Sequence, residues 1–257
     1  MTDVVVVERD ERVWRVRLNR PEKLNALNDD VRAGLHNAFA ALADEPDVAV
    51  VVLSGEGRAF SAGADLVGAA APPSSPSWAA RRHAVGGWQR LLQLMENVPQ
   101  VTVASLHGHC IGGAALLAAA CDLRIAADTL RVRIPELAIG IPLTWEGVPR
   151  LAREIGLPLA RDLVMTGRSL DAAEAQSCGF VQRLVPAADL APATDALVAE
   201  LLAMPAGPLA LTRGMFSALG RERLGPAGWA DADILAWSFT EDEGRAAARD
   251  YRLQMGE

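Results

Sequence analysis

The chain has 257 residues, 51% of them hydrophobic, and a net charge of −7 at pH 7. This length allows one large domain, or a domain with an appendage. A nucleic-acid partner is disfavoured, because there is no basic run and a phosphate backbone would be repelled. The longest apolar stretch, near Ala114 to Cys121, is far below the roughly 18 to 20 residues of a membrane span. Residues 1–10 lack a signal-peptide pattern, so we expect a cytoplasmic protein with no membrane partner.

Strand and helix patterns alternate in the first half of the chain. Period-two alternation indicates strands, and apolar residues at a spacing of three and four indicate helices. The predicted elements are a hairpin (4–7 and 13–18), a helix from Asn28 or Asp29 to before Pro46, a strand (48–53), a helix from about Trp78 to Asn97 interrupted at Gly86-Gly87, and a strand (101–104). The segment 70–77 has three prolines and three serines, which is typical of a mobile loop.

The second half becomes increasingly helical. Short strands are expected at 123–126, 131–134 and 180–185. Ser169 can cap a helix that runs to Cys178. Everything from about Asp189 onward has helical periodicity. Repeated strand and helix units of this kind predict the α/β class.

Two glycine segments, Gly57 to Asp65 and His107 to Ala114, suggest a site made of backbone groups. Each follows a β-branched apolar run, and each ends at small residues that open a helix. Unpaired N–H groups at such a turn can stabilise a negatively charged oxygen, as in an oxyanion hole. Ala64 and Gly113 are the candidate donors. Gly113 also starts the predicted helix, whose dipole adds to its donor.

These two segments, with Arg20 to Asn25 and Ile134 to Leu151, resemble the crotonase (enoyl-CoA hydratase/isomerase) superfamily. The resemblance implies a crotonase-like spiral of ββα units over residues 1–195, with the acyl-CoA site. It also implies a helical C-terminal region, 196–257, that packs on neighbouring subunits in a homotrimer or a dimer of trimers. The expected partner is an acyl-CoA thioester. Coenzyme A is then part of the substrate, and no separate cofactor is expected.

Glu136 is the candidate proton carrier. Residues 137–142 after it are almost all apolar, so burial should raise its pKa. A glutamate at a strand end is usually solvated, but the resemblance places a catalytic glutamate here. Two-glutamate hydratases keep a second one three residues after the oxyanion-hole glycine, and this chain has Leu116 there. A single carboxylate resembles the isomerases that shift a Δ3 double bond to Δ2.

Two other functions stay open. One is an enoyl-CoA hydratase that uses Glu136 alone or with another group, for which Glu146 and His109 are the nearest choices. The other is a non-catalytic acyl-CoA binder, which would have no need of a desolvated Glu136. The discriminating observation is whether Glu136 points between the Ala64 and Gly113 amides or to solvent.

The resemblance also implies contacts with coenzyme A and the acyl chain. Lys23 is the only lysine among 25 basic residues, and it can meet a phosphate as a point donor. Trp145 is expected to shape the acyl pocket by its bulk. The candidate substrate-binding residues are Lys23, Leu24, Ala26, Ala62, Asp65, Leu66, Leu116 and Trp145.

Other chemistries have weaker support in the sequence. Ser61 lies in a near miss of the G-x-S-x-G elbow of serine hydrolases, with Ala59 in place of the first glycine. The histidines offer no metal-binding spacing beyond His107-x-His109, so no metal is expected. Neither a GxxxxGK[ST] loop nor a GxGxxG turn occurs, so ATP and NAD are not implied.

Overall fold

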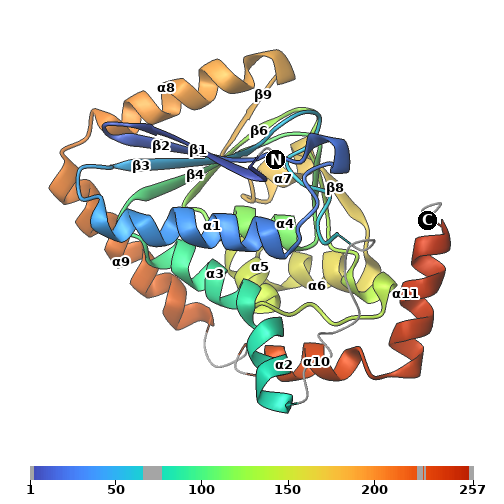
Figure 1. Ribbon diagram of the computed structural model, residues 1–257. Helices are drawn as coiled ribbons and strands as arrows, with labels where there is room; N and C mark the ends of the chain where they lie inside the picture. Colours follow the sequence, from blue (N-terminus) through green and yellow to red (C-terminus); the bar gives the residue numbers. More distant parts are fainter. Residues whose placement is uncertain (1–2, 66–76, 225–227, 229, 255–257) are drawn as a thin grey trace.

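The computed structural model describes residues 3–65, 77–224, 228 and 230–254 and has an α/β fold (Figure 1). The strands are β1 (Val5–Asp10), β2 (Val13–Leu18), β3 (Val50–Gly55), β4 (Val101–Leu106), β5 (His109–Ile111), β6 (Leu123–Ala127), β7 (Arg131–Arg133), β8 (Ser169–Asp171) and β9 (Arg183–Val185). A six-stranded sheet has the order β1-β2-β3-β4-β6-β9 and is parallel except for the β1–β2 hairpin. A smaller sheet, β5-β7-β8, lies beyond the ends of these strands.

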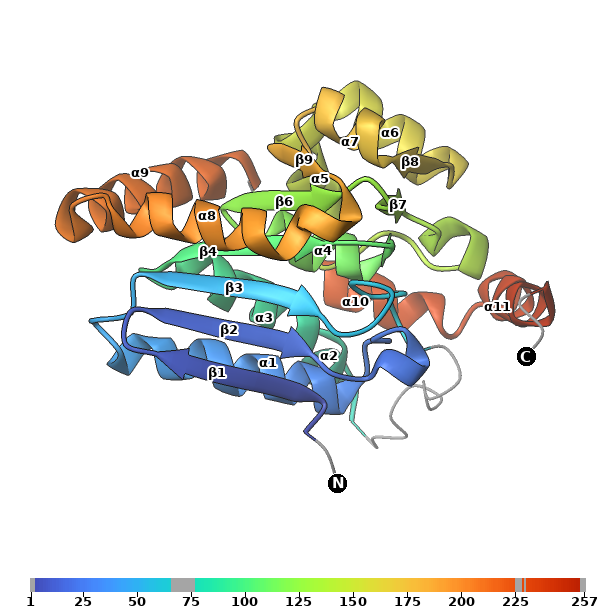
Figure 2. The same cartoon turned by 90° about the horizontal axis from the view of Figure 1, so that it is seen from above.

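Helices cover both faces of the large sheet. They are α1 (Asp29–Ala41), α2 (Trp78–Val85), α3 (Gly87–Asn97), α4 (Gly113–Ala119), α5 (Gly147–Ile155), α6 (Leu157–Thr166), α7 (Ala172–Ser177), α8 (Leu190–Leu202), α9 (Ala206–Leu224), α10 (Asp231–Ser238) and α11 (Asp242–Gln254). Short 3₁₀ helices are η1 (Pro21–Lys23), η2 (Leu42–Asp44), η3 (Glu136–Ile139) and η4 (Ala187–Asp189). In Figures 1 and 2, α8 lies on one face of the sheet, and α1 and α3 lie on the other.

The apolar residues of β3 divide between these two faces. Val51 and Leu53 join the main core, which α1, α3 and α4 close. Val50 and Val52 point the other way and pack near Leu197 of α8. A strand covered on both sides needs an unbroken apolar run. This explains the sequence of residues 48–53.

Most predicted elements are confirmed. The hairpin forms, the first helix ends before Pro46, and the break at Gly86 separates α2 from α3. Asn28 caps α1, since its Oδ1 accepts a hydrogen bond from the Val31 amide at 2.9 Å. The loop prediction for 70–77 falls, apart from Ser77, outside the described residues.

The prediction for residues 169–178 is wrong in one respect. Ser169 does not cap the helix, because Ser169–Asp171 pairs with β7 as strand β8. Asp171 is the cap instead, accepting a hydrogen bond from the Glu174 amide at 2.9 Å. Strand β5 was also not predicted, since three residues carry no readable alternation.

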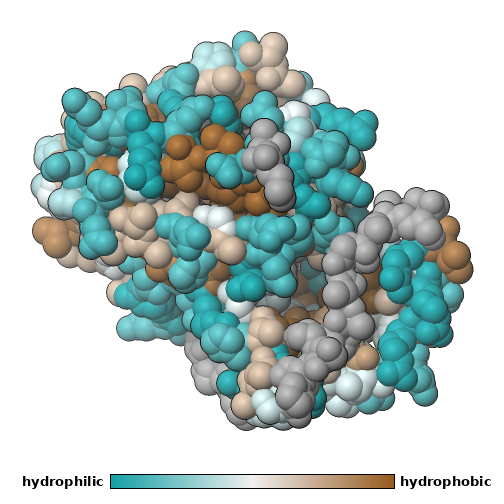
Figure 3. All heavy atoms as spheres, viewed as in Figure 1, coloured by the Kyte–Doolittle hydropathy of each residue, from teal (hydrophilic) through white to brown (hydrophobic). Residues whose placement is uncertain are grey.

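The C-terminal helices pack on the rest of the chain. Helix α9 contacts α5, α10 contacts α2, and α11 contacts η3. Among the described helices none is by itself long and apolar enough to cross a membrane, and one pair, Ala187–Leu202 with Ala206–Glu222, reaches that composition only across a 106° bend. The face seen in Figure 3 is mostly hydrophilic, with a hydrophobic patch near the β1 edge of the sheet.

Candidate active site

The two glycine segments lie side by side. The Ser61 amide donates to His109 O at 2.9 Å, and the Ile111 amide donates back to Ser61 O at 3.2 Å. Gly63 has φ +86°, and a methyl group on it would lie 2.5 Å from Ile111 O. Only glycine allows both the conformation and this close approach. The sheet therefore fixes the two segments against each other.

Two backbone amides at this junction donate no hydrogen bond to any residue that the structure describes. The Leu27 amide donates to Gly63 O at 2.8 Å, and the Asp65 amide donates to Leu27 O at 3.0 Å. These two bonds flank Ala64 and do not use its N–H. Gly113 is the first residue of α4, where an N–H has no acceptor in its own helix. Within the described residues neither amide donates a hydrogen bond. Free donors of this kind can stabilise a developing oxyanion.

Glu136 points into the molecule, against Gly112, rather than to solvent. Its side chain is buried, with 9% of the residue exposed. A methyl group at Gly112 would lie 2.7 Å from Glu136 Oε1, so the carboxylate rests on the residue before Gly113. Oε2 has no hydrogen-bond partner among the described residues. Burial raises the pKa of Glu136 to about 7, against a smaller lowering by its own backbone amide.

The turn that carries Glu136 packs against the C-terminal helix α11. Gly140 ends η3 in the left-handed conformation, with φ +78°. A methyl group on Gly244 would lie 2.7 Å from Gly140 O. A methyl group on Gly140 would lie 2.7 Å from Gly244 Cα. The two backbones therefore touch. The C-terminal region helps to place the carboxylate.

Leu116 and Trp145 form the apolar side of the site. Leu116 is fully buried on α4, and a methyl group at Gly147 would lie 3.0 Å from its Cδ1. The indole of Trp145 covers the Cα of Gly113, where an added methyl group would lie 2.9 Å from Cη2. The ring stacks on Trp88, with centroids 5.1 Å apart. Position 116 therefore places an apolar side chain on this side of the site.

The predicted coenzyme A segment is bonded to the first glycine segment. The Ala62 amide donates to Leu24 O at 2.9 Å, and Arg20 forms an ion pair of 2.9 Å with Asp65. Lys23 ends η1 with its side chain exposed. Ala26 is buried beside this turn. Leu66, also predicted to contact substrate, lies outside the described residues.

Sequence reasoning did not assign Asn25, which holds this segment together. Its Nδ2 donates to Ala59 O and to Glu56 O, both at 2.8 Å, and its Oδ1 accepts from the Arg20 amide. Asn25 also has φ +55°. A buried asparagine in the left-handed conformation is typical of a structural turn. The sequence signal for this turn was the asparagine within the run Arg20 to Leu27.

Several weighed residues are not brought to the reacting position. His109 is exposed on β5. The Glu146 carboxylate accepts hydrogen bonds from Gln93 at 2.9 Å and from Gln89 at 3.2 Å. Ser61 is fully buried, and its hydroxyl donates to Asn25 O. Ser61 therefore has a structural role and is unsuited to nucleophilic attack.

Asp122 and Arg124, close together in the sequence, each form an ion pair with a residue from another part of the chain. Asp122 pairs with Arg213 at 3.2 Å, and Arg124 pairs with Glu154 at 2.5 Å. Both pairs lie beyond the C-terminal end of α4. They stabilise the fold there and do not reach the amide pair.

Comparison with known proteins identifies the family of this chain. The sequence profile described as enoyl-CoA hydratase/isomerase matches residues 8–250. The chain belongs to the enoyl-CoA hydratase/isomerase family. A Mycobacterium bovis family member named "Probable enoyl-CoA hydratase echA8" is 39% identical over 207 residues, covering 79% of this chain and 78% of that protein. The crotonyl-CoA hydratase of Syntrophomonas wolfei is 31% identical, covering 77% and 75%.

Solved structures of the enoyl-CoA hydratase/isomerase family share the fold. An enoyl-CoA hydratase from Mycobacterium avium subsp. paratuberculosis superposes with a TM-score of 0.87 at 25% identity, covering 98% of this chain and 96% of that one. A Thermobifida fusca protein in complex with acetoacetyl-CoA has a TM-score of 0.77 at 31% identity, covering 91% and 93%. These comparisons confirm the crotonase-type fold. Because the relatives are named hydratases, they do not confirm the isomerase prediction.

Proposed function

We propose that this enzyme shifts the double bond of an enoyl-CoA from Δ3 to Δ2, with Glu136 as the only side-chain proton carrier. One observation carries the proposal: the buried carboxylate of Glu136 lies against Gly112, next to an amide that donates to no described residue, and Leu116 occupies the place where a second carboxylate would stand. The Thermobifida fusca neighbour, which holds acetoacetyl-CoA, supports an acyl-CoA substrate.

The proposed reaction is a proton transfer through a thioester enolate. Ionised Glu136 takes a proton from C2 of the 3-enoyl-CoA, and the electron pair moves into the thioester carbonyl. The oxygen, now negative, accepts hydrogen bonds from the Ala64 and Gly113 amides, worth about 10²- to 10³-fold in rate per donor. Protonated Glu136 then returns the proton to C4, and the double bond forms between C2 and C3. A pKa of about 7 suits both steps.

Hydration of a 2-enoyl-CoA is the second candidate, and the names of the relatives favour it. Addition of water requires one group to take a proton from water and one to supply a proton at C2. Glu136 would have to do both, because the Glu146 carboxylate is engaged by Gln93 and Arg150. A binder without catalysis would have no use for a carboxylate held away from solvent against Gly112.

A substrate panel separates these functions. Purified protein is given 3-hexenoyl-CoA or crotonyl-CoA, and double-bond migration and hydration are followed separately, with Glu136→Gln as the matched control. We expect fast migration and slow hydration, both lost in the control. Efficient hydration without migration would overturn the isomerase proposal. It would also require a second group to handle water.

The remaining expectations concern coenzyme A and assembly. Lys23 and the Leu24 to Ala26 turn are proposed to contact the nucleotide end of coenzyme A, with Lys23 at a phosphate. A trimer-based assembly is supported by the exposed apolar side chains Leu211, Met215 and Phe216 on α9. Such patches typically mark interfaces between subunits.

A further inference from the structure

The turn at Trp145 and Glu146 has an unusual backbone. Both residues adopt the left-handed conformation, with φ +60° and +55°, and neither is glycine. Side chains rarely occupy this region, and two in succession store strain that the surroundings must hold. The turn lies directly before α5 and over the oxyanion glycine Gly113. Leu24 and Asn25 share this conformation in a structural turn, so the role of the Trp145–Glu146 turn has to be argued from its contacts.

Hydrogen bonds from two helices fix the backbone of the turn. The Glu146 amide donates to Asp231 Oδ2 at 2.6 Å, and Asp231 is a buried residue at the start of α10. The guanidinium of Arg150 donates to Trp145 O at 2.5 Å. One contact comes from the C-terminal region and the other from α5. The turn is therefore held from both sides.

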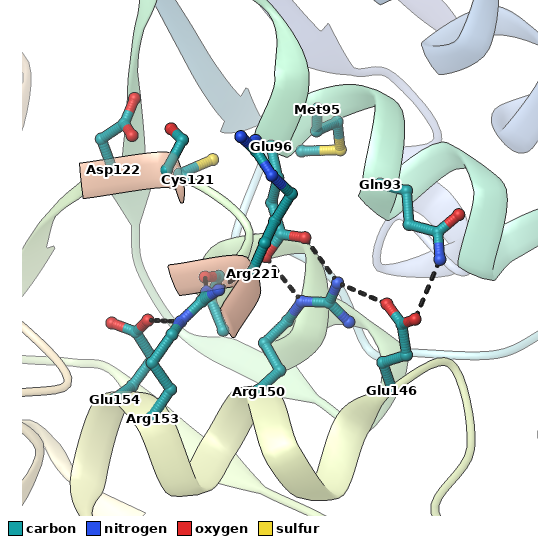
Figure 4. Close-up of polar contacts among 12 residues, drawn as sticks. Gln93, Met95, Glu96, Cys121, Asp122, Glu146, Arg150, Arg153, Glu154 and Arg221 are labelled. Atoms are coloured by element: carbon teal, nitrogen blue, oxygen red, sulfur yellow. Dashed lines mark hydrogen bonds and ion pairs between the residues drawn. The ribbon is translucent and has the colours of Figure 1, made fainter. Parts of the chain in front are cut away.

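The Glu146 side chain is held as well. Its carboxylate accepts a hydrogen bond from Gln93 on α3 and lies 3.3 Å from Arg150 (Figure 4). It also accepts a hydrogen bond from Gln89 of the same helix. Arg150 is fully buried and also pairs with Glu96 at 2.7 Å. A buried guanidinium with two carboxylates has little freedom to move. An alkyl chain cannot enter this cluster without breaking its ion pairs.

The clamped turn carries the Trp145 ring into the acyl side of the site. The benzo edge, through Cζ3 and Cη2, meets Gly113, and one face of the ring stacks on Trp88. Because Nε1 belongs to the other ring of the indole, the group turned to Gly113 is hydrocarbon. This edge therefore lies against the residue whose amide is the candidate oxyanion donor. Trp88 supports the face of the same ring, and Glu146 and Arg150 hold the turn that carries it.

We propose that the Trp145–Glu146 turn is a clamped wall that ends the acyl pocket, so that the enzyme takes short-chain acyl groups. In this proposal Asp231 and Glu146 are positioning residues that hold Trp145 in place. The inference rests on the proposed function only in taking acyl-CoA as the ligand. It does not depend on whether the reaction is isomerisation or hydration.

Binding of saturated acyl-CoAs tests the wall without any turnover. Each methylene that reaches apolar surroundings is worth a factor of about four in affinity. For the wild type we expect the gain to stop after hexanoyl-CoA in calorimetric titrations that run from butyryl- to decanoyl-CoA. In Trp145→Gly, which also relieves the positive φ, the gain continues to decanoyl-CoA. Trp237→Ala, a change at an exposed tryptophan on α10, should behave as the wild type.

Two results would overturn the proposal that Trp145 ends the acyl pocket. One is a wild-type affinity that keeps rising about fourfold per methylene up to decanoyl-CoA. The other is a Trp145→Gly series identical to the wild type in a folded protein. Trp145→Leu, which keeps an apolar side chain, supplies the series if the glycine variant does not fold. If no acyl-CoA binds at all, the proposed function fails instead, and the two failures are thereby distinguished.

The clamp is tested by the chain-length profile of Asp231→Ala. We expect a partial extension toward octanoyl-CoA, because the Glu146 amide loses its acceptor and the turn loosens. Asp231→Asn retains an oxygen acceptor and should restore the wild-type profile. Asp233→Ala removes another α10 carboxylate, one that pairs with Arg82 instead, and is the matched control. If Asp231→Ala weakens all chain lengths equally, Asp231 is only structural and the clamp is wrong.

Discussion

The two halves of the candidate site are built in different ways. The proposed oxyanion half consists of the backbone amides of Ala64 and Gly113, and hydrogen bonds between neighbouring segments of the core fix it. The side-chain half consists of Glu136 and Trp145, and each lies in a turn that contacts a C-terminal helix. Substitutions should therefore separate the two halves. Changes in the core should disturb charge stabilisation, and changes in α10 and α11 should disturb the acid/base group and the acyl wall.

The largest effect is expected from Glu136→Gln. This variant keeps the shape of the side chain and removes the base, so turnover should fall by about 10²- to 10⁴-fold. Acyl-CoA binding should change little, since the amide pair and the coenzyme A segment are untouched. Single-turnover kinetics and equilibrium titration measure the two quantities separately. Unchanged turnover would remove Glu136 from the mechanism.

Gly113→Ala tests the backbone half. The added methyl group would meet the Trp145 ring, 2.9 Å from Cη2, and would displace the first turn of α4. Loss of one aimed donor predicts a fall in kcat of about 10²- to 10³-fold. Removing the obstacle in the double variant Gly113→Ala/Trp145→Gly should recover part of this loss. Full activity of the single variant would mean that Gly113 does not supply the donor.

Gly244→Ala tests whether α11 positions the turn that carries Glu136, in the side-chain half of the site. Its methyl group would lie 2.7 Å from Gly140 O and push on the turn that carries Glu136. We expect kcat to fall by about tenfold, because small misplacements of a reacting group are costly. Gly214→Ala in α9, which has open space around it, is the control and should have no effect. Equal activities of both variants would show that η3 is positioned by the core alone.

The smallest effect is expected at the edge of the site. Lys23→Ala should raise KM for acyl-CoA by a few-fold with little change in kcat, since an exposed cation contributes modestly to phosphate binding. The difference from wild type should shrink at high salt. Titration with free coenzyme A at low and high salt measures it. Equal affinity at low salt would make Lys23 an ordinary surface residue.

Features that depend on local sequence could be predicted, whereas features that depend on contacts between separate segments could not. The Asn28 cap, the end of α1 before Pro46 and the break at Gly86 follow from local preferences, so the sequence predicts them. The apolar neighbours of Glu136 likewise indicate its burial. Strands β5 and β8 depend on partners from distant parts of the chain, and three residues carry too little pattern to reveal them.

Contacts between distant segments account for the rest. The ion pair of Arg20 with Asp65 and the approach of Gly244 to Gly140 join segments far apart in the chain. The placement of Trp145 on Gly113 depends on Asp231, which lies 86 residues further along the chain than Trp145. No local pattern contains this information. It explains why sequence reasoning treated Trp145 as bulk alone and left Asp231 unassigned.

The pH dependence of double-bond migration tests the central claim most directly. Burial places the pKa of Glu136 at about 7, and the base acts in its ionised form. For the conversion of 3-hexenoyl-CoA to 2-hexenoyl-CoA, kcat/KM should therefore rise with pH through an apparent pKa of about 7 and level off above it. In Glu136→Gln this rise should disappear. A wild-type profile without any inflection near 7, or the same inflection in Glu136→Gln, would contradict the account.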